Sequence, residues 1–179
     1  MTTSKDRLRR AARNVRRRVN QPKLLEALAQ TGRECGPCSA CCNAKAVPPL
    51  RKPAGTPCEH VSPDGGCAIH GSDERPRECG IYYCAWRVTD RLRDEHRPDV
   101  SGLVIDPPKQ ALRPFVAWEV WPGAADQPPG QGAINALCSQ GFSVAVATHD
   151  GQRRLFGRPD LLHAILRSAE AATAEGGEP

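Results

Sequence analysis

The cysteines are the residues of this sequence with the clearest chemistry. The chain has 179 residues and nine cysteines, of which eight lie in the segment 35–84. In chain order these eight are Cys35, Cys38, Cys41, Cys42, Cys58, Cys67, Cys79 and Cys84. Thiolates are soft ligands for zinc, iron and iron–sulfur clusters, and a turn with the spacing Cys35-x2-Cys38 aims two of them at one ion. The sequence therefore predicts a metal-binding segment.

The number and spacing of the cysteines leave the identity of the metal open. Eight thiols suffice for two four-cysteine sites or for one larger cluster, and one of them could instead be a free reactive thiol. Cys41 and Cys42 are adjacent, and adjacent side chains of an extended chain point to opposite sides, which favours two ions or a multinuclear cluster. Lys45 replaces the fourth cysteine of the bacterial ferredoxin pattern, and the second CxxC pair of a zinc ribbon is missing. We predict zinc, iron or an iron–sulfur cluster.

Two histidines and the ninth cysteine are the next candidates. His60 and His70 lie near Cys58 and Cys67, so each is a candidate ligand or a hydrogen-bond donor to a thiolate. Cys138 stands far from the other cysteines, and we predict that it is a small buried apolar residue.

These residues and their spacing resemble a known family, the bacterial CxxCxxCC cysteine-cluster proteins with the YkgJ-like zinc- or iron-chelating domain. The matching stretches are Cys35-Gly-Pro-Cys38-Ser-Ala-Cys41-Cys42, Lys52-Pro-Ala-Gly-Thr-Pro-Cys58-Glu-His60, Gly66-Cys67-Ala-Ile69 and Arg75-Pro-Arg-Glu-Cys79-Gly-Ile-Tyr82-Tyr-Cys84-Ala-Trp86. Two positions depart from the pattern, because Gly80 stands where the family commonly has arginine and His70 where it commonly has tyrosine. The resemblance covers less than a third of the chain.

The resemblance implies that the eight cysteines form one metal-chelating cluster. Members are often labelled iron–sulfur oxidoreductases, which makes an oxidoreductase the first interpretation if the protein is an enzyme. A similar motif in flagellin lysine methylases makes a methyl-transferring enzyme an alternative. Arg75 fits a supporting role as a hydrogen-bond donor to thiolate sulfur, and Tyr82 and Trp86 fit one in excluding water, with plain packing as the alternative for all three.

The remaining sequence predicts an α+β fold in which a small metal-stabilised cysteine-rich module joins a short antiparallel sheet with two or three helices. We divide the chain into a basic helical arm (1–32), the cysteine-rich module (33–87), a small α+β unit (88–172) and a disordered tail (173–179). In the arm, a helix over 23–30 should turn Leu24, Leu25 and Leu28 inward and end at Gly32. Apolar runs predict strands at 101–106, 115–120, 142–148 and 153–156, and helical spacing predicts helices at 131–139 and 160–172.

Charge and hydropathy limit the partners. Residues 1–20 carry eight lysines and arginines against one acid. We favour a solvated arm that packs Val15 and Val19 on the domain, with contact to nucleic acid or an anionic surface as the alternative. There is no apolar run long enough for a membrane span and no apolar core of a secretory signal, so we expect a cytoplasmic protein with reduced thiols. No nucleophile–base pair or phosphate loop stands out.

The leading hypothesis is a metal-binding protein with a structural, redox or metal-handling role, with a protein redox partner if the metal is an iron–sulfur cluster. A redox or methyl-transferring enzyme and a zinc-stabilised nucleic-acid-binding module are the alternatives.

Overall fold

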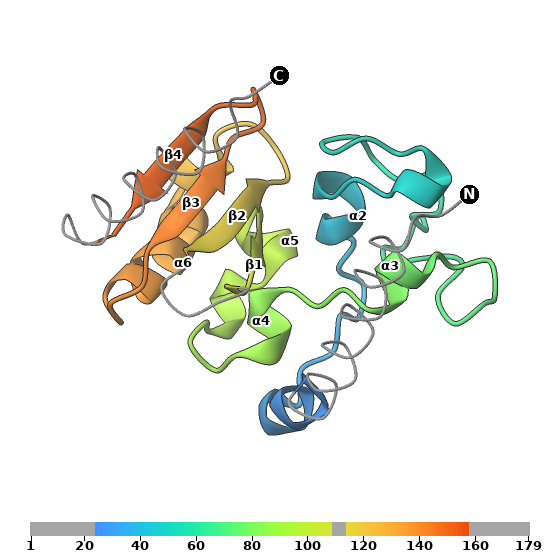
Figure 1. The fold of residues 1–179 in the computed structure, drawn as a ribbon, viewed down its shortest axis with the longest axis horizontal. Coiled ribbons are helices and arrows are strands. Elements are labelled where there is room, and N and C mark those ends of the chain that lie inside the picture. The colour runs from blue at the N-terminus through green and yellow to red at the C-terminus, as the bar shows by residue number, and fades with distance from the viewer. Residues whose placement is uncertain (1–23, 109–113, 158–179) are drawn as a thin grey trace, which may run out of the picture.

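The computed structural model describes residues 24–108 and 114–157. A four-stranded sheet backed by a helix forms one part, and the cysteine-bearing loops and short helices form the other (Figure 1). After a first helix at 24–31, the elements are α2 (Ala40–Ala44), η1 (Pro48–Leu50), α3 (Arg77–Gly80), α4 (Ala85–Val88), η2 (Asp94–His96), α5 (Pro98–Ser101), β1 (Leu103–Asp106), β2 (Phe115–Glu119), η3 (Ala124–Asp126), α6 (Pro128–Cys138), β3 (Val144–Ala147) and β4 (Arg153–Phe156).

The sheet has the strand order β1-β2-β3-β4, and the α+β class is confirmed. The β1–β2 and β3–β4 pairs are antiparallel, as expected, but β2 and β3 are parallel, so the expectation of an antiparallel sheet is wrong for the central pair. The reason is the connection between them, because η3 and α6 carry the chain back across the sheet before β3 begins. More short helices are present than the two or three expected.

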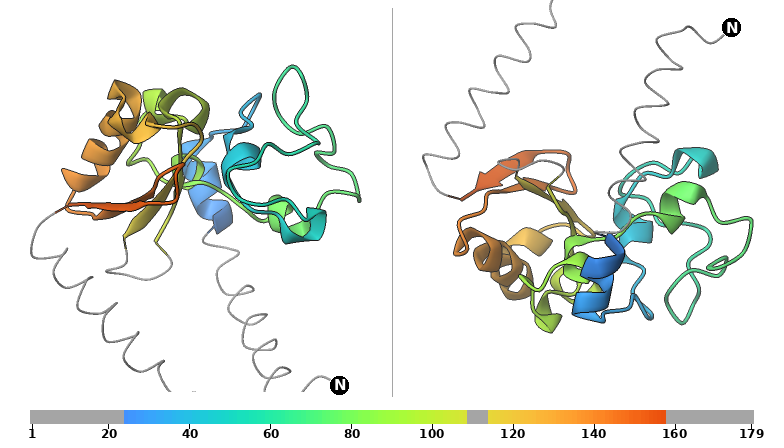
Figure 2. Two further views of the ribbon diagram at one scale, coloured as in Figure 1. Left: turned by 90° about the horizontal axis from the view of Figure 1, so that it is seen from above. Right: turned by 60° about the horizontal axis from the view of Figure 1, so that its bottom comes forward.

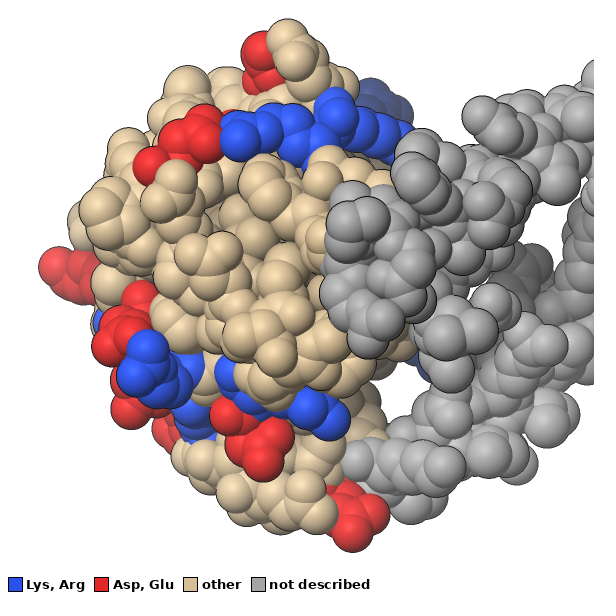
Figure 3. All heavy atoms as spheres, turned by 90° about the vertical axis from the view of Figure 1, so that its left-hand side faces the viewer, with Lys and Arg blue, Asp and Glu red and all other residues tan. Residues whose placement is uncertain are grey.

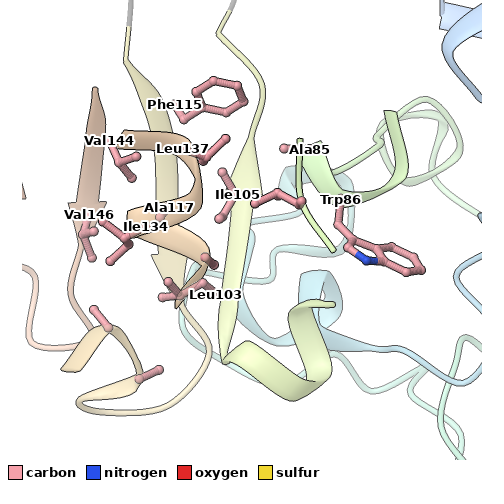
Figure 4. Close-up of a cluster of buried hydrophobic side chains, with 14 residues drawn as sticks. Ala85, Trp86, Leu103, Ile105, Phe115, Ala117, Ile134, Leu137, Val144 and Val146 are labelled. Atoms are coloured by element: carbon pink, nitrogen blue, oxygen red, sulfur yellow. The ribbon is translucent and has the colours of Figure 1, made fainter. Parts of the chain in front are cut away.

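The main core lies between α6 and the sheet, as Figure 4 shows. The sheet contributes Leu103, Ile105, Phe115, Ala117, Val144 and Val146, and the helix contributes Ala133, Ile134 and Leu137. Along β2 buried and half-buried residues alternate, which is the period of a strand with one face on the core. Cys138 is half-buried against this core, in agreement with its predicted packing role.

Helix α6 begins at Pro128, three residues earlier than expected. Proline suits the first helical turn, where its missing N–H would have no helical partner, so Pro128 and Pro129 belong to the helix rather than to the preceding loop. The helix at 24–31 ends at Gly32 with φ +61°, as expected. Leu25 is 59% exposed, however, so the expectation that three leucines face inward is wrong for this one, which lies on the solvent side.

The cysteine-bearing part has little regular structure, and its small apolar cluster joins Ala40 and Ala44 of α2 to Val104 of β1. It meets the sheet part along β1, an edge strand that contacts α2, α4 and α5. In both views of Figure 2 the cysteine-bearing loops lie beside the sheet, away from α6 and β4. A fold of this kind leaves the loops to be held by polar contacts and, where one binds, by a metal.

Some expectations fall on residues outside those described. They are the Arg-rich segment 1–20, the helix at 160–172 and the tail at 173–179. On the face of the molecule shown in Figure 3, the described acidic and basic side chains lie around a broad area without charges and form no continuous basic surface. None of the helices in the described ranges is long and apolar enough to cross a membrane.

Candidate metal centre

All eight cysteines of the segment 35–84 line one cavity of about 220 Å³, which we call the cysteine cavity. His60, Arg75 and Tyr82 also line it, together with Lys45 and apolar side chains such as Val104. His70 and Trp86 are not among the lining residues. His70 is exposed, and Trp86 is buried in the core of the sheet part. The structure thus brings together residues that lie up to about fifty positions apart in the sequence.

The first four cysteines come from a turn and the helix that follows it. The Cys38 N–H donates to the Cys35 carbonyl over 3.0 Å, and Gly36 takes the positive φ of +52° that closes this turn. Helix α2 then carries Cys41 and Cys42 on successive positions, with Ala40 and Ala44 buried beneath them.

Cys58 and Cys67 lie in two irregular loops joined by backbone hydrogen bonds. Val61 donates its N–H to the Cys58 carbonyl over 3.1 Å and forms an isolated β-bridge with Cys67. The loop before Cys67 is tied to the first turn, because the Gly66 N–H donates to the Pro37 carbonyl over 2.8 Å. These contacts bring the two loops to the Cys35–Cys38 turn.

Cys79 and Cys84 are placed by two one-turn helices. Cys79 lies in α3, which begins after Pro76, and Cys84 is the residue that precedes α4. The backbone N–H of Arg87 in α4 donates to the Cys84 carbonyl over 3.0 Å, and its guanidinium donates to the Cys35 sulfur over 3.7 Å. One arginine therefore links the first and the last cysteine of the segment.

The thiols differ in acidity because their surroundings differ. A hydrogen bond from the Cys41 thiol, together with the charges of Lys52 and Arg75, lowers the pKa of Cys42 to about 7 against the opposing effect of burial. The same contact raises the pKa of Cys41, since the proton is held on that sulfur. Burial raises the pKa of Cys84 to about 11. The lowered pKa of Cys42 favours its thiolate form near neutral pH.

Positive charges lie close to the thiols. Lys52 is 8% exposed, and its ammonium donates to the backbone carbonyls of Lys45 and Pro53. Burial lowers the pKa of Lys52, while the thiols of Cys58, Cys42, Cys41 and Cys79 act in the opposite direction. Arg75 donates one N–H to the Cys79 carbonyl over 2.9 Å, and its buried Nε has no hydrogen-bond partner among the residues that the structure describes.

The donor set of the cavity fits a soft metal. Eight sulfurs and one imidazole match zinc or iron far better than magnesium or calcium, which prefer oxygen. The unpartnered Nε of Arg75 fits a negatively charged group in the cavity, such as a metal-bound thiolate. All nine cysteines are free, and within 24–108 and 114–157 no three cysteine, histidine, aspartate or glutamate side chains converge closely enough to hold an ion. The sulfurs would therefore have to move toward a metal as it binds.

One group next to the cavity was not found by reading the sequence. The Asp106 carboxylate, at the end of β1, accepts hydrogen bonds from the Lys45 ammonium, from the Tyr82 hydroxyl over 2.7 Å and from the Trp118 indole over 3.0 Å. The Lys45 ammonium also lies 4.4 Å from the centre of the Trp118 ring. Tyr82 thus turns its hydroxyl toward the sheet rather than toward the thiols. In the sequence Asp106 is a single acidic residue at the end of a predicted strand and belongs to no motif, so nothing pointed to its role.

The fold and the site define a cysteine-rich α+β protein. Over 89 residues the chain is 32% identical to the UPF0153 protein PA1578.1 from Pseudomonas aeruginosa, a match that covers 46% of this chain and 88% of that protein. The chain belongs to the UPF0153 family, which is the YkgJ-like cysteine-rich family. No family model matches the chain, and no solved structure matches it either.

Proposed function

We propose that this protein binds a thiophilic metal, zinc or iron, through the thiols of the cysteine cavity. The observation that supports this function best is that all eight cysteines of the segment 35–84 line one cavity, although they lie on separate turns, loops and short helices. The buried Lys52 and the half-buried Arg75 beside them offset the charge that thiolates would bring into the protein.

The two metals would give the protein different roles. Zinc held by four thiolates has no open position, so it would clamp the loops and stabilise the fold. An iron–sulfur cluster would add electron transfer, with a potential set by hydrogen bonds to sulfur and by burial, and the proposal would then include a protein redox partner. Both forms use the same cysteines.

The first experiment is to purify the full chain without oxygen and to measure its metals, its acid-labile sulfide and its visible spectrum. About two zinc ions per chain and no colour would support the structural form. Iron with sulfide and a brown colour would support the electron-transfer form. Protein that holds neither metal, and that takes up neither zinc nor iron when they are supplied, would overturn the proposal.

Single Cys→Ser variants test which residues hold the metal. We expect Cys35→Ser, Cys41→Ser, Cys58→Ser and Cys79→Ser to lower metal content and solubility. Cys138→Ser is the matched control, because Cys138 packs against the sheet core rather than lining the cavity, and it should change neither. Full metal content in all four variants would contradict the assignment.

A further inference from the structure

The adjacent pair Cys41 and Cys42 face different parts of the cysteine cavity. They occupy successive positions of helix α2, and successive side chains on an α-helix are about 100° apart around its axis. Cys41 packs against the apolar cluster of Ala40, Ala44 and Val104, and Cys42 does not belong to that cluster. The pair is therefore a point at which the thiols can divide into two groups.

Cys41 shares its side of the cavity with three other cysteines. Cys38 and Cys84 pack against the same apolar cluster as Cys41. Cys35 is joined to Cys38 by the turn and to Cys84 through Arg87, which contacts the Cys35 sulfur and the Cys84 backbone.

Cys42 is left with the three remaining cysteines of the cavity, Cys58, Cys67 and Cys79. Cys58 and Cys67 are neighbours through their backbone contacts with Val61. Arg75 binds the Cys79 carbonyl and lines the cysteine cavity together with Cys42, Cys58 and Cys67.

We infer that the eight cysteines form two separate four-thiol sites, one built from Cys35, Cys38, Cys41 and Cys84 and the other from Cys42, Cys58, Cys67 and Cys79, each binding its own metal ion. The inference rests on the proposed metal binding and adds the assignment of ligands to sites. The first site joins the Cys35–Cys38 turn and α2 to α4, next to the sheet. The second site joins α2 to the loops of Cys58 and Cys67 and to α3. The contact between Cys41 and Cys42 connects the two sites.

The two sites differ in their surroundings. The first lies against apolar side chains, with the Arg87 guanidinium at Cys35. The second lies beside the buried Lys52 and the half-buried Arg75, whose Nε has no hydrogen-bond partner among the described residues. Because positive charge offsets the negative charge of four thiolates, we expect the second site to keep its metal longer when a chelator is added.

Paired substitutions test the assignment with the number of lost thiols held constant. The full chain is loaded with Zn²⁺, and the bound ions are counted by native mass spectrometry. Cys38→Ser with Cys84→Ser, or Cys58→Ser with Cys67→Ser, removes two ligands from one site, so each pair should bind one Zn²⁺ in place of two. Cys38→Ser with Cys58→Ser removes one ligand from each site and should leave neither ion firmly bound. Equal losses in all three pairs would overturn the assignment in favour of one cluster.

A second measurement uses the unaltered chain, so it does not depend on whether the variants fold. Zinc-loaded protein is treated with a limiting amount of chelator, and the freed thiols are labelled with iodoacetamide and located by mass spectrometry. Chains that keep one Zn²⁺ should be labelled at the four cysteines of one site and at none of the other. Labels spread over both sites would overturn the division while leaving metal binding intact. Failure of the unaltered chain to bind Zn²⁺ would contradict the division as well, and failure with iron too would overturn the proposed function.

Discussion

At the scale of single residues, Arg75 has the most specific relation to the thiols. Its side chain binds the Cys79 backbone and favours the thiolate forms of Cys42 and Cys79, while its Nε has no partner among the described residues. A buried N–H donor without an acceptor costs free energy. A metal-bound sulfur would accept a hydrogen bond from it and remove this cost. Arg75 is thus suited to stabilise the metal-bound state more than the metal-free one.

We expect Arg75→Met to weaken metal retention by roughly tenfold, which corresponds to the loss of one charge-assisted hydrogen bond of about 1.4 kcal/mol. Zinc transfer to a competing chelator measures the effect. Arg77→Met is the matched control, because Arg77 is an exposed arginine two residues further along the chain, in α3, and does not line the cavity. Equal retention in the two variants would show that Arg75 acts only in packing.

The buried His96 should make the stability of the fold depend on pH, and this effect does not involve the cysteines. Its side chain is 2% exposed, and its Nδ1 accepts the Arg93 N–H over 3.1 Å. Burial lowers its pKa below 6.5, and Arg93 and Arg33 lower it further against the opposing effect of Glu95. The unfolded chain therefore takes up this proton more readily, so stability should fall as the pH drops through and below 6.5.

The test compares melting temperatures at pH 7.5 and pH 5.5 for the natural chain and for His96→Asn, whose amide oxygen can still accept the Arg93 N–H. The melting temperature of the natural chain should fall more between pH 7.5 and pH 5.5 than that of the variant. Because metal release at low pH affects both chains, the difference between them isolates His96. An identical loss in both would contradict the expectation.

At the scale of elements, Asp106 connects the cysteine-bearing part to the sheet. It lies at the end of β1 and accepts from Lys45 after α2, from Tyr82 after α3 and from Trp118 in β2. The carboxylate is 23% exposed, so these contacts are screened less than those of a surface pair. One side chain therefore fixes the position of two cysteine-bearing segments relative to the sheet.

Asp106→Asn should lower the free energy of unfolding by about 2 kcal/mol, because the neutral amide loses the charge pairing and cannot accept all three hydrogen bonds. Urea unfolding measures this change. Asp126→Asn is the matched control, since Asp126 pairs with Arg154 at an exposed position where the effect should be much smaller. A larger loss for Asp126→Asn would contradict this role of Asp106.

The contact between the loop of Cys67 and the Cys35–Cys38 turn depends on a glycine. Gly65 has φ +85°, and a Cβ there would overlap the Pro37 carbonyl oxygen. Gly71 has the same φ of +85° with no atom within 4 Å of its Cβ position. The two glycines therefore have the same φ and differ only in the room available for a side chain.

Gly71→Ala should cost about 1 to 2 kcal/mol of stability for the left-handed backbone alone. Gly65→Ala should cost more and should also reduce zinc retention, because the alanine pushes the Cys67 loop away from the turn. Unfolding midpoints and zinc content of both variants measure the difference. Equal effects would show that this contact does not position the cysteines.

At the scale of the whole molecule, the two parts are stabilised differently. The sheet part has a core of fourteen buried residues that includes Trp86 and Leu137, whereas the apolar cluster of the cysteine-bearing part is built on Ala40, Ala44 and Val104. Small side chains bury little apolar area, so the loops of the second part have little hydrophobic stabilisation of their own. Metal binding would supply what the small cluster lacks.

Metal removal should therefore act unevenly across the chain. Metal in thousandfold excess over its dissociation constant stabilises a protein by about 4 kcal/mol, and its removal should loosen the segment 35–84 while β1, β2, β3 and α6 stay protected. Hydrogen exchange before and after chelation, followed by mass spectrometry, measures this. A uniform loss of protection would show instead that the sheet also depends on the metal.

The local elements were largely predictable, because side-chain period is a property of consecutive residues. β4 has the expected bounds at Arg153–Phe156, and β2 and α6 lie within three residues of theirs. The parallel pairing of β2 with β3 was not predictable, since it depends on how the intervening helix packs across the sheet. The prediction that Leu25 faces inward was wrong for a similar reason, because the sequence pattern does not show which side of a short helix packs against a neighbour.

The sequence alone determined which residues could bind a metal, because soft sulfur donors at close spacing are a chemical property of the chain. It also pointed to Arg75 as a candidate for a supporting role, and the structure places this residue in the wall of the cysteine cavity. Only the tertiary structure decided which thiols are neighbours, and that the Asp106 carboxylate holds Lys45 and Tyr82. These groups come from distant segments, and their proximity follows from the packing of α2, α4 and β1, for which no local spacing carries a signal.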